Sequence, residues 1–307
     1  MKRKIREVVK ESGNKEDSLF GKIKSQAAME YLMTYGWAIL IIVLALGVLY
    51  SLGIMNPKNF IPRAPPGSCF VFRPNGPGTT DFISLQGSCG YLPMYVADFW
   101  NCSSCINTGY SPIVVSIGSF LPTTSSLTIA WWVWPNNCGY GNNVNLHLKT
   151  NNGAPGGNGV FCYLNNCNVP NVGVSAPPSS QDKTWFFMTL VLYSNGTAIY
   201  YKNAQPGSAA TWSGSLTGIS NFYIFGYEPG CADLLRGRIA NVQLYSTALT
   251  PQEVKYLYQQ GLGGAPIRIG SLVGWWPLNG DAKDYSGNNL HGTIYGGVTF
   301  VQNYNPP

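Results

Sequence analysis

Ser126-Leu-Thr-Ile-Ala-Trp-Trp-Val-Trp134 carries the clearest strand pattern in the chain. Successive side chains of a β-strand point to opposite faces of a sheet. Leu127, Ile129, Trp131 and Val133 are therefore predicted to share one face. Because all four are apolar, we interpret the stretch as a core strand.

Further strand signals follow at short intervals. The run 185–193 is apolar on both faces, as expected for a strand that is covered on both sides. The turn residues Ser194-Asn195-Gly196 and the run 197–202 complete a hairpin signal. Many short strands separated by turns predict an all-β sandwich or jelly roll. The other expected elements are strands at 221–226 and 238–245 and long Gly/Asn/Pro loops at 139–158 and 165–180.

One helix is predicted in this β-rich part of the chain. Thr250-Pro-Gln-Glu253 is a capping box with proline at the first helical position. Val254, Leu257 and Tyr258 would share one face, and Gly261 would end the helix.

Several of these segments resemble the LamG-like (concanavalin A-like) jelly rolls. Residues 126–135 are similar to an early core strand of that family, and 185–188 and 195–203 to its central strand and the hairpin after it. Residues 238–254 resemble the closing strand and short helix, and 272–293 strongly resemble the opening segment. The resemblance implies a LamG-like jelly-roll domain over about residues 94–303.

The order of these segments departs from the family, because the opening segment comes after the closing helix. One sandwich needs one opening segment, and none is found before residue 94. We expect a circularly permuted domain, which compact domains tolerate because their termini often lie close together. The alternative is a truncated second repeat.

The N-terminal part has a different composition. The segment from Tyr31 to Pro57 contains no charged residue. As a helix, this segment is long enough to cross a hydrocarbon core of roughly 30 Å. We expect a single transmembrane helix at 26–55, preceded by a basic cytoplasmic leader at 1–25. A Pro-rich stalk is expected at 56–68, and a small Cys-containing β segment at 69–93.

The junction of leader and apolar run resembles the class III signal of archaeal type IV pilin-like proteins. A basic patch at Lys22 and Lys24 precedes Ser25 and Gln26, and Glu30 follows four residues after Gln26. The resemblance implies cleavage between Ser25 and Gln26, with Glu30 serving subunit assembly. The alternative is an uncleaved cytoplasmic tail on a signal anchor.

All eight cysteines follow the apolar run, and an even count on the outer side of a membrane predicts disulfide bonds. Redox or zinc use of Cys102-Ser-Ser-Cys105 is the alternative, and eight cysteines leave the connectivity open. Two sequons, at Asn101 and Asn195, are candidate glycosylation sites. The candidate disulfide cysteines are Cys69, Cys89, Cys102, Cys105, Cys138, Cys162, Cys167 and Cys231.

The best polar constellation is residues 281–289, in which Asp281, Asp284 and Asn288 offer the oxygen ligands that Ca²⁺ prefers. The alternative is a turn in which these side chains bond to the backbone. Together with the two long loops at 139–158 and 165–180, the segment 281–289 could form a binding rim. Exposed aromatic residues could stack on sugars, with Trp134, Tyr140, Trp212 and Tyr227 as the candidates. The alternative is that most of them belong to the core.

The sequence argues against two classes of function. The glucanases of the resembling fold carry closely spaced carboxylates along one strand, and no such spacing appears here, so no enzyme is expected. The net charge of +6 lies mainly in the leader, where eight Lys and Arg face four Asp and Glu, so nucleic-acid binding is not expected.

These features together predict a cell-surface protein with a cytoplasmic N-terminus and an extracellular C-terminal domain. It would be a membrane-anchored or pilus-type filament subunit that presents a lectin-like adhesion domain, with a glycan or a surface protein as ligand. The alternatives are a single-span surface protein that does not polymerise and, more distantly, a glycan hydrolase.

Overall fold

The computed structural model describes two compact units of the chain, Met1–Arg63 and Ala64–Pro307. The leader and the Pro-rich segment lie outside the described residues, as do Ser25, Gln26, Asn101 and four of the cysteines. The described residues are Glu30, Met33, 35–48, Ser51, 69–87, 89–99, 113–118, 120–121, 123–135, 144–150, 159–170, 172–177, 183–213, 216–225 and 237–302.

In the first unit, residues 35–48 are helical and their side chains are exposed. Trp37 and Ile41, for example, are 67% and 62% exposed. No helix within the described residues has the length and apolar character that crossing a membrane requires. The predicted span at 26–55 lies partly outside the described residues.

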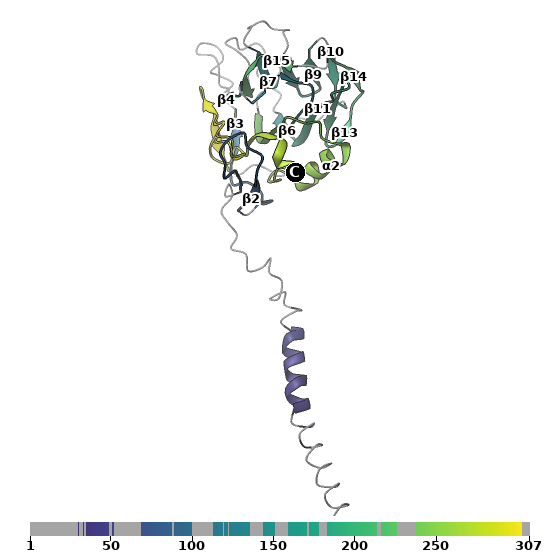
Figure 1. The fold of residues 1–307 in the computed structure, drawn as a ribbon, viewed down its shortest axis with the longest axis vertical. Coiled ribbons are helices and arrows are strands. Elements are labelled where there is room, and N and C mark those ends of the chain that lie inside the picture. The colour runs from purple at the N-terminus through teal and green to yellow at the C-terminus, as the bar shows by residue number, and fades with distance from the viewer. Residues whose placement is uncertain are drawn as a thin grey trace, which may run out of the picture. The chain divides into compact units, whose positions relative to one another are not determined.

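The second unit is a sandwich of two antiparallel sheets (Figure 1). The larger sheet has the order β13-β12-β11-β6-β17-β3-β20, with β14 also beside β12 and β18 also beside β17. Its strands are β3 (Val96–Asp98), β6 (Leu127–Pro135), β11 (Phe186–Leu192), β12 (Thr197–Lys202), β13 (Gln205–Pro206), β14 (Ala210–Thr211), β17 (Gly237–Tyr245), β18 (Leu272–Trp276) and β20 (Thr299–Val301).

The smaller sheet has the order β10-β9-β8-β7-β16-β4-β19. Two short two-stranded pairs, β1 with β2 and β5 with β15, complete the strands of the described residues. The strands of the smaller sheet and the two pairs are β1 (Phe70–Phe72), β2 (Ser84–Gln86), β4 (Ile113–Ser116), β5 (Thr123–Thr124), β7 (Val144–Thr150), β8 (Val160–Tyr163), β9 (Asn166–Val169), β10 (Val172–Ser175), β15 (Leu216–Thr217), β16 (Ile219–Ile224) and β19 (Thr293–Ile294).

The main hydrophobic core lies between the two sheets. Leu127, Ile129, Trp131 and Val133 of β6 all belong to it, so the alternation predicted from the sequence is confirmed. The intervening residues of β6, such as Trp132, face the other way into a second hydrophobic cluster.

This second cluster covers the outer face of the larger sheet. Trp132 of β6 packs there against Tyr258 of α2 (Pro251–Gln260), with ring centroids 5.9 Å apart. Val71 of β1 and the Cys69 side chain are buried in the same cluster. The larger sheet is therefore covered on both faces, which explains why β11 is apolar at nearly every position.

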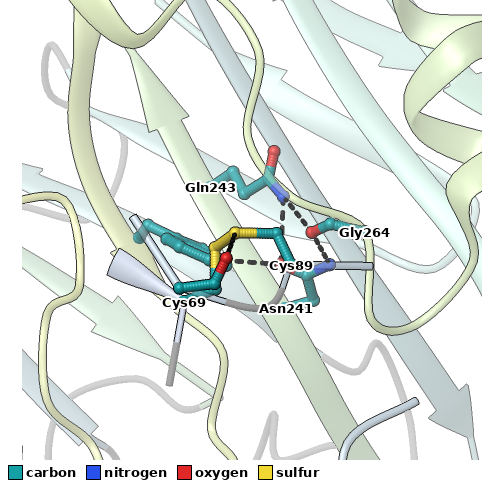
Figure 2. Close-up of a disulfide and its surroundings, with 7 residues drawn as sticks. Cys69, Cys89, Asn241, Gln243 and Gly264 are labelled. Carbon is teal, nitrogen blue, oxygen red and sulfur yellow. Dashed lines mark hydrogen bonds between the residues drawn. A yellow bond between two sulfur atoms is a disulfide. The ribbon is translucent and has the colours of Figure 1, made fainter. Parts of the chain in front are cut away.

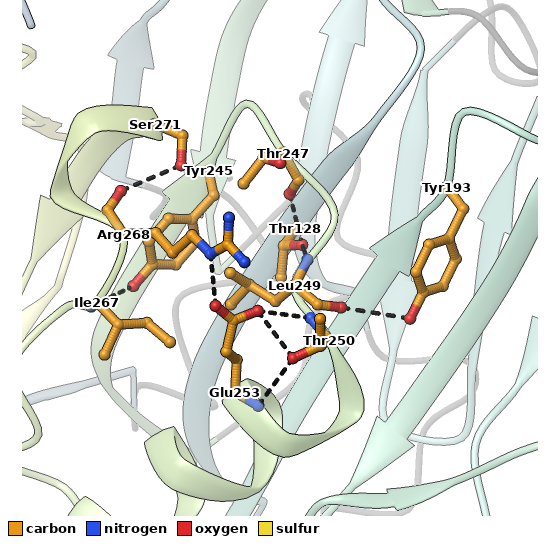
Figure 3. A network of polar contacts seen from close by, with 10 residues as sticks. All are labelled: Thr128, Tyr193, Tyr245, Thr247, Leu249, Thr250, Glu253, Ile267, Arg268 and Ser271. Carbon is orange, nitrogen blue, oxygen red and sulfur yellow. Dashed lines mark hydrogen bonds and ion pairs between the residues drawn. The ribbon is translucent and has the colours of Figure 1, made fainter.

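The start of α2 follows its sequence signal. Thr250 accepts a hydrogen bond from the Glu253 amide, and the Glu253 carboxylate accepts one from the Thr250 amide, so the predicted capping box is present (Figure 3). Arg268 donates a side-chain hydrogen bond to the same carboxylate. Arg268 lies just before the short 3₁₀ helix η4 (Ile269–Ser271).

The C-terminal segment contributes to both sheets of the sandwich. β18 pairs with β17, β20 pairs with β3, and β19 pairs with β4 of the smaller sheet. Residues 272–301 therefore complete this sandwich, as the permuted arrangement requires, and do not start a separate one.

The prediction of long loops at 139–158 and 165–180 was wrong in part. Residues 144–150 form β7, residues 166–169 form β9 and residues 172–175 form β10. Cys167, Val169 and Val174 supply buried apolar side chains at alternate positions among the Asn and Gly residues. This alternation favours strands, although the Asn and Gly content of the segment is typical of loops.

Candidate functional site

The segment 281–289 lies between β18 and β19 and is built around the Asp284 carboxylate, which is buried. Its Oδ1 accepts hydrogen bonds from the Trp275 amide at 3.0 Å and the Ser286 amide at 2.8 Å. Its Oδ2 accepts from the Ser286 hydroxyl at 2.8 Å and the Leu290 amide at 2.9 Å. Four protein donors therefore surround this carboxylate.

The other two predicted calcium ligands also bond to the protein. Asn288 Oδ1 accepts from the Gly78 amide at 2.7 Å. Asp281 accepts from the Lys283 amide and, at 3.2 Å, from the Tyr285 hydroxyl. Burial, together with the Asp281 charge, raises the pKa of Tyr285 to about 12. These are the contacts of a backbone-bonded turn, and calcium binding stays a prediction.

The remaining described carboxylates do not form a catalytic pair. Asp98 is the only Asp or Glu on any described strand, and it pairs with Arg238 at 3.4 Å. Desolvation raises the pKa of Asp98, although Arg238 acts in the opposite direction. Within the described residues no three His, Cys, Asp or Glu lie together in a way that could hold a metal ion.

A small pocket opens on the outer face of the larger sheet, over β17 and β18. The Cys69–Cys89 disulfide and the residues after it form one wall, and the loop after α2 forms another. The cavity volume is about 40 Å³. Since one water needs about 10–15 Å³ of such volume, the pocket holds roughly three waters.

Asn241 lies at the floor of this pocket, at a bulge in β17 where its φ is 49°. Its Oδ1 accepts from Trp275 Nε1 at 2.8 Å and from Gln243 Nε2 at 3.0 Å. Its Nδ2 donates to the Gly264 carbonyl at 2.8 Å (Figure 2). Gln243 also donates to the Gly264 carbonyl at 3.2 Å.

Asn279 also lines the pocket. Its Oδ1 accepts from the backbone amides of Met94 and Tyr95 at 2.9 and 2.8 Å. The Tyr91 side chain, 44% exposed, stands at the rim. None of the described residues that line the pocket is charged.

Two disulfides lie within the described residues, Cys69–Cys89 and Cys162–Cys167. Disulfide bonding is therefore confirmed for four of the eight predicted cysteines. Cys162 and Cys167 face each other in the β8–β9 register, so this bond closes a short hairpin. Cys102, Cys105, Cys138 and Cys231 lie outside the described residues.

Other candidate residues are distributed over the molecule. Asn195 is exposed in the turn between β11 and β12, where its Oδ1 accepts from the Thr197 amide, and its glycosylation stays a prediction. Trp134 and Trp212 are buried and present no sugar-stacking face. Tyr140 and Tyr227 lie outside the described residues.

Within the described residues, two parts of the predicted rim lie at different edges of the smaller sheet. The hairpin β9–β10 lies at one edge of the smaller sheet, whereas β19, which follows the 281–289 turn, lies at the other. Five strand spacings of about 4.8 Å separate β9 from β19, roughly 24 Å. The turn packs instead beside β1, since Arg73 donates to the Ser286 carbonyl at 2.8 Å.

Sequence reasoning missed Asn241, Asn279 and the Gly263-Gly264 pair of the pocket. A Cβ on Gly263 would lie 1.6 Å from the Tyr91 carbonyl oxygen, so only glycine allows this close approach. The sequence offers one signal, the two polar residues Asn241 and Gln243 within the otherwise apolar run 239–245.

Comparison with known proteins agrees with this architecture. Residues 107–255 match the family model described as the concanavalin A-like lectin/glucanases superfamily, of the laminin G type. No curated protein matches the sequence. The region 107–255 is therefore a concanavalin A-like lectin/glucanase domain.

Two solved structures are similar to this chain, and the first, with a TM-score above 0.5, bears on its fold. A presumed carbohydrate-binding protein from Bacteroides ovatus is 16% identical with a TM-score of 0.51, and the match covers 73% of this chain and 64% of that one. A heptameric SAP-like pentraxin from Limulus polyphemus is 14% identical with a TM-score of 0.47, covering 68% of this chain and 95% of that one. This chain thus spans less than two thirds of the first protein, and likeness at such identity shows the fold alone.

Proposed function

We propose that this chain is a membrane-anchored surface protein whose C-terminal domain binds glycans without hydrolysing them. The observation that carries the proposal is the lectin/glucanase domain at 107–255, in which the only carboxylate on a described strand pairs with an arginine. Retaining and inverting glycosidases need two carboxyl groups flanking the bond they cleave. The described strands offer one, so binding is favoured over hydrolysis.

The pocket over β17 and β18 supports a neutral ligand. Its lining combines side-chain amides with Trp275, Tyr91, two prolines and a disulfide, and the described lining residues carry no charge. Amides beside apolar surface are suited to hydroxyl and carbonyl groups on a sugar, since ligand sites use a few polar groups on a mainly apolar wall.

The anchor is proposed from the N-terminal composition. No charged residue occurs from Tyr31 to Pro57, and the described helical residues 35–48 expose apolar side chains. Such side chains are stable in lipid or against a second copy of the chain, and unfavourable in water. The eight basic residues of the leader favour a cytoplasmic N-terminus.

Assembly into a filament extends this proposal. Cleavage between Ser25 and Gln26 would leave Glu30 as the fifth residue of the mature chain, near a new amine. The alternative, a surface protein that does not polymerise, would keep its leader. N-terminal sequencing of the native protein separates them, because an intact leader contradicts processing.

The binding proposal is tested with the purified full chain in detergent on a glycan array, with product analysis of the same glycans. We expect at least one glycan class to bind and none to be cleaved. Release of shorter glycans would establish the hydrolase alternative, and absence of all binding would leave a surface protein as the ligand.

A further inference from the structure

We propose that the pocket over β17 and β18 receives the acetamido group of an N-acetylated sugar. This inference deepens the proposed function and rests on it. It follows from which hydrogen-bonding groups of the pocket are already used and which remain.

Two acceptors of the pocket, Asn241 Oδ1 and the Gly264 carbonyl, each accept two hydrogen bonds. Both lone pairs of Asn241 Oδ1 are used, by Trp275 Nε1 and Gln243 Nε2. The Gly264 carbonyl likewise accepts two hydrogen bonds, from Asn241 Nδ2 and Gln243 Nε2. Of the two N–H groups on Asn241 Nδ2, this network uses one.

The same holds for a second side-chain amide of the lining. Asn279 Oδ1 accepts two backbone amides, those of Met94 and Tyr95, so the acceptor side of this amide is full as well. The group that Asn279 retains for a ligand is its Nδ2, a donor. Asn241 and Asn279 thus both present N–H groups and no free acceptor.

The orientation of both amides is fixed by their partners. The Trp275 indole can only donate, so the Asn241 atom that it contacts at 2.8 Å must be oxygen. The Met94 and Tyr95 amides are also donors, which fixes Asn279 in the same way. A flip of either side chain would set N–H against N–H.

These two side chains offer N–H donors and no free acceptor, so they favour a ligand oxygen that only accepts, such as a carbonyl. A carboxylate would satisfy the same donors, but the described lining offers no positive charge to offset the cost of removing it from water. The neutral acetamido carbonyl avoids this cost.

Size and wall chemistry agree with an acetyl group. The cavity of about 40 Å³ holds roughly three waters, and an acetyl group has three heavy atoms. Leu262, Pro93 and Pro277 supply apolar surface for its methyl group. A whole sugar ring does not fit, so the ring would lie outside the pocket, beside the exposed Tyr91.

The first test uses the wild-type full chain in detergent with N-acetylglucosamine, N-acetylgalactosamine, the two parent hexoses and acetamide. Saturation-transfer NMR should show the strongest transfer to the acetyl methyl protons, and acetamide should compete. The parent hexoses should bind at least about tenfold more weakly, since they leave the pocket donors unpaired. Equal binding of acetylated and parent sugars would overturn the inference.

The second test changes one donor. Asn279→Asp keeps the oxygen that accepts the Met94 and Tyr95 amides and replaces Nδ2 by an acceptor, so N-acetylated sugars should bind about tenfold more weakly. Asn203→Asp is the matched control, because Asn203 Oδ1 also accepts a backbone amide, that of Phe187, and Asn203 does not line the pocket. Its binding should equal that of the wild type.

The outcomes separate this inference from the proposed function. If glycans bind equally well with and without the acetyl group, and equally well to the wild type and to Asn279→Asp, the proposed function stands and the pocket assignment is refuted. Absence of binding to every glycan refutes the proposed function itself. If Asn279→Asp does not fold, the wild-type saturation-transfer pattern decides alone, and transfer confined to ring protons counts against the pocket.

Discussion

Replacing Asp284 tests the reasoning about the 281–289 segment most directly. Its carboxylate accepts four hydrogen bonds, three of them from the backbone amides of Trp275, Ser286 and Leu290. Asp284 is 7% exposed, so water cannot readily replace it. In Asp284→Ala these amides lose their partner.

The expected loss of stability follows from these contacts. Leaving a buried donor without a partner costs about 1–3 kcal/mol. Three such amides, partly relieved by relaxation, predict a decrease of about 3–6 kcal/mol in the free energy of unfolding. Since domains are stable by about 5–15 kcal/mol, Asp284→Ala should approach the limit of folding.

The assay is urea unfolding of the full chain in detergent, followed by tryptophan fluorescence. Asp281→Ala is the matched control, because its carboxylate is one-third exposed and accepts only from Lys283 and Tyr285. It should cost about 1 kcal/mol or less. A loss below about 1 kcal/mol in Asp284→Ala would refute the structural role of these bonds.

Thermal unfolding of the wild-type protein, with calcium and with chelator, tests the calcium hypothesis. A cation bound to the folded state raises the melting temperature by linkage. Wild-type protein should melt at a higher temperature in calcium than in chelator if Asp281, Asp284 and Asn288 bind the ion. Equal melting temperatures would leave only the structural turn.

Three further perturbations have defined outcomes. Ending the chain after Gly264 removes β18, β19 and β20 and should yield an aggregated or protease-sensitive domain, whereas a protease-resistant product would favour a vestigial repeat. Replacing Cys69 and Cys89 by alanine removes a cross-link between residues 20 apart in sequence, so the free energy of unfolding should fall by about 2–4 kcal/mol. Binding of N-acetylated sugars should weaken as well, and unchanged binding would show that the disulfide is not needed for the pocket. Burial acts to raise the pKa of Glu253, but hydrogen bonds from Arg268 and Thr250 lower it below 4.5. The stability from this group is therefore present above about pH 4.5 and is lost as the pH falls through the lowered pKa. The unfolding of Glu253→Gln should depend less on acid pH than that of the wild type, and identical pH profiles would contradict this.

The parts of the fold that follow from neighbouring residues were predictable. The alternation of β6 and the capping box of α2 depend on residues close in sequence, and the structure has both where they were expected. The β9–β10 hairpin was missed because its Asn and Gly residues resemble a loop. Its first strand also pairs with β8, where Cys162 bonds to Cys167, and these contacts are not visible in the local sequence pattern.

The pocket could not be predicted in the same way. Asn241, Gly264 and Asn279 come from three separate segments, and Met94 and Tyr95 from a fourth. Which atoms remain free for a ligand depends on how many partners each acceptor has, and those partners are set by the tertiary structure. Composition shows only that Asn is abundant.

Asn241 links the pocket to the way the late segment joins the sandwich. Its φ of 49° is costly for most residues but tolerated by Asn, and it places a bulge in β17. On the edge of β17 away from β6, Arg238 and Ile239 before the bulge pair with β3, whereas residues 242–245 after it pair with β18. The bulge therefore allows the same edge of β17 to pair with two strands, β3 and β18. The same residue contacts Trp275 of β18 and Gly264, so the C-terminal segment that completes the sheet also builds the floor of the pocket.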